Sequence, residues 1–136
     1  MTRSTCISSV LLATALVCGC GSSSTPTTPD APVSVTDTST GTLTINGATT
    51  FPFAVQQTGA VSVTLTTLSD AMATVGLSLG TYNVAGACQI IIANDNATQG
   101  NTVSGTATST GNFCARLYDV GKLTAPVDYQ ISVTHY

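Results

Sequence analysis

Three residues of this chain occur in the order that many serine hydrolases use. The segment 76–80 reads G-L-S-L-G, and Asp119 and His135 follow Ser78 along the chain. That pattern indicates a nucleophile only where a strand turns sharply into a helix and presents the serine above a parallel sheet. Apolar and small residues alternate through the segment instead, the apolar ones being Val75, Leu77 and Leu79. We therefore predict that Ser78 lies on the polar face of a strand, and a small hydrolase using Ser78 is kept as an alternative.

His135 is the single histidine of the chain. It falls in the same alternating phase as the apolar residues before it, namely Tyr129, Ile131 and Val133. The phase predicts a side chain at the end of a strand, at the rim of the fold. A metal ligand or a general base is the alternative, since a neutral imidazole suits both roles.

Oxygen ligands gather at one point of the sequence. Asn94, Asp95 and Asn96 are consecutive, and Asp70 or Asp119 would approach them from neighbouring loops. Carboxylate and amide oxygens are what calcium prefers, so these five residues are candidate calcium ligands. The alternative is a turn that closes the preceding strand, because Asn and Asp side chains hydrogen-bond their own backbone in turns. No other cofactor is predicted.

Four tyrosines offer a second kind of site. A flat aromatic surface for carbohydrate would form if they were exposed together, and the residues are Tyr82, Tyr118, Tyr129 and Tyr136. The phase of Tyr129 predicts that it faces the core, which weakens this idea.

The start of the chain has the layout of a secretory signal. A single positive charge at Arg3 precedes an apolar run over 7–17, which is too short for a membrane-spanning helix of about 20 residues. The residues around Cys20, with Gly19 before it and a Ser/Thr/Pro-rich stretch after it, resemble the processing site of bacterial lipoproteins. The resemblance implies that Cys20 carries lipid and begins the mature protein. Cleavage at Cys18, or ordinary cleavage with release, is the alternative.

Domain boundaries follow from this assignment. We expect a signal peptide over 1–19, a lipidated Cys20 with a flexible linker over 20–35, and one folded domain over 36–136. Gly21 stands where an aspartate would resemble an inner-membrane retention signal. We therefore expect the protein to lie in the bacterial cell envelope, where the lipid anchors it in the outer membrane.

Two cysteines remain in the folded part, Cys88 and Cys114. Export places them in an oxidising compartment, where two remaining thiols most simply form a disulfide. A metal site with His135 or a catalytic thiol is the alternative.

Composition limits the partners and the fold class. The net charge is −3, with 3 Lys and Arg against 6 acidic residues, so the surface has no electrostatic reason to bind nucleic acid. Lys, Glu and Arg, which commonly occupy exposed helix positions, are scarce, and this composition favours strands.

Short alternating segments repeat along the chain between turn signals. They lie at 42–45, 51–55, 61–65, 75–79, 113–118 and 129–134, and Asn46-Gly47 is one of the turns between them. A period of two with one apolar face is typical of half-buried antiparallel strands. The segment from Cys88 to Ala93 is continuously apolar and predicts a central strand. The sequence thus predicts an all-β, antiparallel β-sandwich of about eight strands, with an unknown strand order.

The segments 51–55, 59–65, 111–118 and 129–133 resemble the strands of pre-peptidase C-terminal domains. That family implies a jelly-roll-like β-sandwich over most of the folded part. Some of its members bind calcium or a polymeric substrate, and Asp70 stands near the position of the family's acidic residue.

Three functions are consistent with these observations. The first is a non-catalytic, lipid-anchored sandwich that binds an envelope or extracellular partner or has a structural role. The second is a calcium-dependent adhesion or substrate-binding module, and the third is the small serine hydrolase.

Overall fold

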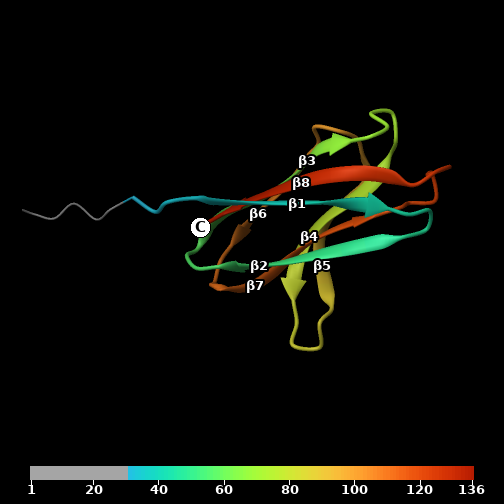
Figure 1. Ribbon diagram of the computed structural model, residues 1–136. Coiled ribbons are helices and arrows are strands. Elements are labelled where there is room, and N and C mark those ends of the chain that lie inside the picture. Colours follow the sequence, from blue (N-terminus) through green and yellow to red (C-terminus); the bar gives the residue numbers. More distant parts are fainter. Residues whose placement is uncertain (1–30) are drawn as a thin grey trace, which may run out of the picture. The chain divides into compact units, whose positions relative to one another are not determined.

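The computed structural model describes residues 31–136, and these residues form two antiparallel four-stranded sheets without a helix (Figure 1). The all-β sandwich predicted from the sequence is confirmed. The predicted signal, Cys20 and most of the linker lie outside the described residues. The strands are β1 (Val35–Leu43), β2 (Ala48–Val55), β3 (Gly59–Leu68), β4 (Val75–Tyr82), β5 (Cys88–Ala97), β6 (Thr102–Ala107), β7 (Gly111–Tyr118) and β8 (Val127–His135).

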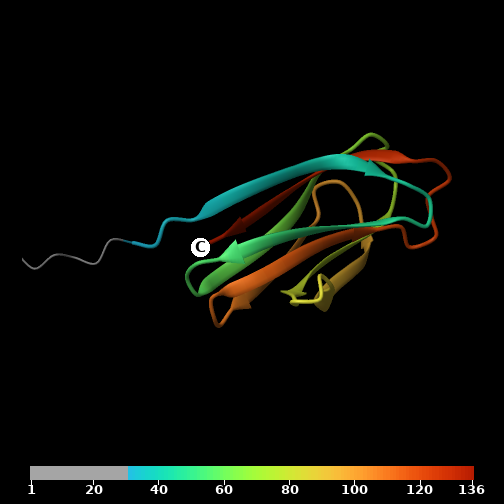
Figure 2. The ribbon, with the colours of Figure 1, turned by 60° about the horizontal axis from the view of Figure 1, so that its bottom comes forward.

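The strand order is that of a jelly roll. One sheet has the order β1-β8-β3-β6 and the other β2-β7-β4-β5, so most connections cross from one sheet to the other. Figure 2 shows β1 and β8 in one layer and β2 and β7 in the layer facing it, and Figure 1 shows the β4–β5 hairpin projecting from the body. The four edge strands are therefore β1 and β6 in one sheet and β2 and β5 in the other.

The core lies between the two sheets. Its largest fully buried side chains are Leu43, Leu65, Leu77, Leu117 and Ile131. Burial of each such side chain contributes about 1.5–3 kcal/mol. Among the described residues, the buried apolar cluster runs from Leu43 to Val133. Residues 31–136 form one compact unit with its own core, which we expect to fold by itself. Within this part of the chain, no helix is long and apolar enough to cross a membrane.

Cys88 and Cys114 form the predicted disulfide, with an S–S distance of 2.07 Å. The bond links β5 to β7, although β4 lies between these strands in the sheet. The backbone of β5 passes close over β4 at Gly80, where an added methyl group would lie 2.7 Å from the carbonyl carbon of Gln89. Glycine is needed at this position because the two backbones approach too closely for a side chain.

The prediction of a central strand at Cys88–Ala93 is wrong, because β5 is an edge strand. Ile90, Ile91 and Ile92 are 43%, 70% and 42% exposed. The register with β4 shifts at two points of this pairing, and the extra residues break the simple alternation of faces. A continuous apolar run in the sequence therefore does not distinguish a buried central strand from an irregular edge strand. The expected side-chain to backbone hydrogen bond at Asn94–Asn96 is present, since Asn94 accepts the N–H of Asn96. The expected end of the strand there is wrong, because β5 continues to Ala97.

Candidate functional site

A hollow opens between the edge strands β1 and β2, which belong to opposite sheets. Its volume is about 240 Å³, and we call it the β1–β2 slot; the lining residues are Asp37, Thr38, Ser39, Phe51, Pro52, Phe53 and Val133. The slot exists because three successive core-facing positions of β1 are small or polar. Asp37, Ser39 and Gly41 take these positions in register with β8, and only Leu43 is fully buried.

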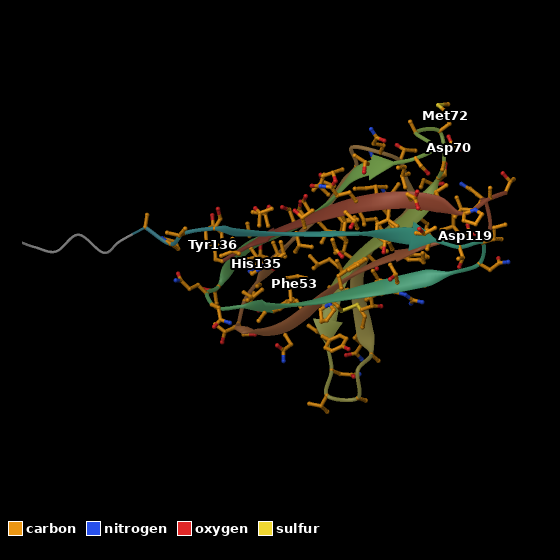
Figure 3. The ribbon with its side chains drawn as sticks, in the orientation of Figure 1. Phe53, Asp70, Met72, Asp119, His135 and Tyr136 are labelled. Atoms are coloured by element: carbon orange, nitrogen blue, oxygen red, sulfur yellow. A yellow bond between two sulfur atoms is a disulfide. The ribbon has the colours of Figure 1, made fainter. Side chains whose placement is uncertain are left out.

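The buried His135 stands at one end of this slot. It is the last residue of β8, as its phase predicted, and it is 4% exposed. Figure 3 shows His135 near Phe53, and the two rings lie 5.1 Å apart. The Nε2 atom of His135 lies 3.1 Å from the Oδ2 atom of Asp37. Because an ionised carboxylate only accepts hydrogen bonds, the Nε2–H group of His135 donates the hydrogen bond to Asp37. The strand pairing explains the contact, since Asp37 is the diagonal neighbour of His135 across the β1–β8 ladder.

Asp37 was not among the residues singled out from the sequence. Its side chain is 59% exposed, so one carboxylate reaches both the buried imidazole and solvent. The sequence did contain a signal for this residue. Asp37 shares the alternating phase of Ser39 and Leu43, and this phase places a charged residue on the core-facing side of a strand. Such an inward-pointing charge is one way in which edge strands are protected from pairing with another chain.

The proposed hydrolase residues are not brought together. Ser78 lies on the outer side of β4, but it is fully buried, and its hydroxyl donates to the carbonyl oxygen of Arg116 at 3.4 Å. The ring of Tyr118 covers the neighbouring Gly76, where an added methyl group would lie 2.7 Å from its Cδ2 atom. His135 contacts Asp37 rather than Asp119, and Figure 3 shows His135 and Asp119 at opposite ends of the sandwich. The glycines of the G-x-S-x-G segment thus serve close packing.

Asp119 holds the loop between β7 and β8. Its two carboxylate oxygens accept four backbone hydrogen bonds of 2.8–3.1 Å. The donors are the N–H groups of Asn46, Gly121, Lys122 and Leu123. These bonds, that from Asn46 foremost, lower the pKa of Asp119 below its ordinary value of 3.8. The role seen for Asp119 is therefore to cap two turns with an ionised carboxylate.

The other candidate calcium ligands also have protein partners. Asp70 and Asn94 each accept the backbone N–H two residues further on, at 3.0 Å. Asp95 accepts a hydrogen bond from the hydroxyl of Tyr118. The side-chain oxygen of Asn96 accepts a hydrogen bond of 2.9 Å from the ammonium group of Lys122. A cation at Asn96 would have to displace that ammonium. Among residues 31–136, no three acidic, histidine or cysteine side chains converge as a metal-binding group.

The tyrosines do not share one surface. Tyr129 is 6% exposed and faces the core, as predicted. Tyr118 packs on β4, and Arg116 lies over its ring at 5.6 Å. Burial and the hydrogen bond to Asp95 raise the pKa of Tyr118 to about 12. Tyr136 packs against Gly59.

Two other hollows of similar size lie on the described part. One, of about 270 Å³, is formed by the β3–β4 and β7–β8 loops and contains one charge of each sign, Asp70 and Lys122. Another, of about 340 Å³, lies beside Tyr82 and contains no charged side chain. The β1–β2 slot differs from both because an aromatic wall meets a carboxylate that is backed by a buried imidazole.

No family model matches the chain, and no curated protein matches it in sequence. The resemblances to bacterial lipoproteins and to pre-peptidase C-terminal domains therefore remain predictions from the residues.

Proposed function

We propose that this protein is a non-catalytic, lipid-anchored β-sandwich of the bacterial cell envelope, which holds a ligand or partner at the membrane or has a structural role there. The lipid is attached to Cys20, and the outer membrane is the proposed location.

One observation carries this proposal. Among residues 31–136, the buried apolar cluster runs from Leu43 to Val133, and the first strand begins at Val35. The sequence between Cys20 and Val35 is rich in Ser, Thr and Pro, a composition that suits a flexible tether. The Cys88–Cys114 disulfide supports export, because such bonds persist in oxidising compartments. Several acyl chains on one cysteine would give stable anchoring, whereas one chain gives only marginal binding.

The non-catalytic part of the proposal has its own support. Ser78 is buried with its hydroxyl engaged, and His135 is held by Asp37 and Phe53. Neither side chain is presented to solvent beside a second reactive group. A Ser78→Ala variant that lost a measured esterase or peptidase activity would overturn this part.

Membrane fractionation tests the anchor. The full chain is expressed in a bacterium that processes lipoproteins, beside Cys20→Ser and the matched control Cys18→Ser. The chain and the Cys18→Ser control should be found in the membrane fraction, and Cys20→Ser should not mature to the same form. Equal membrane association of Cys20→Ser, or its loss in Cys18→Ser alone, would contradict the assignment of Cys20.

A further inference from the structure

We propose that the β1–β2 slot binds an ammonium ion that carries an apolar body, that is, an alkyl- or arylammonium. This inference names a ligand class for the proposed binding role. It does not depend on the lipid anchor.

The charge of the slot selects the sign of the ligand. Asp37 is half-exposed, and His135 is the single basic side chain of residues 31–136 that contacts it. When the imidazole is neutral, the carboxylate that accepts its hydrogen bond keeps its negative charge. The other cations of this part of the chain are elsewhere, since Arg116 lies over Tyr118 and Lys122 donates to Asn96. The negative charge at the slot is therefore available to a cation from solution.

The walls of the slot select an apolar body. Phe51, Pro52 and Phe53 of β2 line one side of it, and Ser39 of β1 and Val133 of β8 line it from the facing sheet. Aromatic rings attract cations as well as apolar groups, and such attraction acts within about 6 Å of a ring centre. The volume of about 240 Å³ lies below the range of pockets for drug-sized ligands, so the slot suits a smaller molecule such as a short alkylammonium. The slot thus combines an anionic end with an aromatic wall.

The walls of the slot are also held in place without a ligand. Phe53 packs between the rings of Phe113, at 6.1 Å, and His135, at 5.1 Å. Phe51 makes an edge contact with Tyr129 at 5.8 Å. A rigid, preformed wall lowers the ordering cost of binding. By contrast, the hollow beside the exposed isoleucines of β5 measures about 70 Å³ and has no charged side chain, so it offers nothing that selects a ligand.

Three probes of equal chain length test the sign of the charge. Hexylammonium, hexanol and hexanoate are titrated into the disulfide-bonded unit 31–136, and amide shifts are followed by NMR. We expect hexylammonium to shift β1 and β2 resonances and to bind about fivefold more tightly than hexanol, as a partly exposed ion pair allows. Hexanoate should bind most weakly. Equal affinity of the three probes, or shifts confined to other strands, would overturn the proposal.

Two variants and a control locate the site. Asp37→Asn keeps an acceptor for His135 and should abolish the preference for hexylammonium over hexanol. Asp128→Asn removes the same charge from the far end of the β1–β8 pair and should keep that preference. Ser39→Leu fills the slot and should weaken all three probes while the melting midpoint is kept. A preference that survives Asp37→Asn, or binding that survives Ser39→Leu, would refute the assignment; membrane fractionation of Cys20→Ser tests the anchor separately.

Discussion

Loss of the Cys88–Cys114 disulfide should remove a large part of the stability of the sandwich. The two cysteines are separated by 26 positions, so the bond closes a loop that the unfolded chain would otherwise leave open. In the chain-entropy treatment, a loop of that length corresponds to about 3.5 kcal/mol. For a domain of this size, the same loss lowers the melting midpoint by roughly 15–25 °C.

The assay is denaturant unfolding of the unit 31–136 in three forms. These are the oxidised protein, the protein kept reduced, and the double variant Cys88→Ala/Cys114→Ala. The reduced form and the double variant should agree with each other and lie about 3.5 kcal/mol below the oxidised form. Cys114 is fully buried, so its replacement by alanine could also change packing. Equal stabilities of the reduced form and the double variant would show that the loss comes from the cross-link rather than from that packing.

Two results would refute this reasoning. One is labelling of both thiols in the native, unreduced protein. The other is a loss of stability below about 1 kcal/mol on reduction, which would mean that the unfolded chain gains little freedom when the loop opens.

Three further predictions concern packing, pH and metal. Gly80→Ala should destabilise the sandwich by about 3 kcal/mol, because the methyl group meets the backbone of Gln89. Gly105→Ala, whose methyl group would lie 3.4 Å from a leucine side chain, should change the free energy of unfolding little; equal effects would contradict the close approach of β5 to β4. Folding raises the pKa of Tyr118 from 10.0 to about 12. The neutral phenol therefore makes its full contribution to the free energy of unfolding below pH 10, and this contribution is lost as the pH rises through 12. Absorbance titration should show one late-ionising phenol that is absent in Tyr118→Phe, and an unchanged titration would count against the contact. Calcium and chelator should give the same melting midpoint, since the candidate ligand oxygens have protein donors; a rise with calcium would instead support the calcium-dependent module, because a ligand of the native state stabilises it.

The alternation of apolar residues was sufficient to predict most strands and their inward faces. Leu77, Leu117 and Ile131 are fully buried, as their phase requires. The strand β6 was not singled out, because Thr102–Ala107 contains a single large apolar side chain, Val103. Ile45 was assigned to a strand but lies in the turn that follows β1, where it is 45% exposed. Local patterns do not report where a chain crosses from one sheet to the other.

The site was less predictable than the fold. The phase of His135 correctly indicated a strand-end position, but its partner Asp37 lies 98 positions away and depends on the pairing of the first strand with the last. Ser78 was predicted on a polar surface but is buried. The outer side of β4 is covered by side chains of β7, as Tyr118 covers Gly76, and local sequence does not report such tertiary contacts. Hollows arise where facing side chains are unequal in size, as at Ser39 and Phe51, and this requires the register of both sheets.

The most direct test of the account is the mass of the N-terminal peptide of the mature protein, taken from the membrane of a bacterium that processes lipoproteins. The account predicts a peptide that begins at Cys20 and carries diacylglycerol on that residue. A mature protein that begins elsewhere, or a Cys20 without lipid, would contradict the claim that this sandwich is held at a membrane surface.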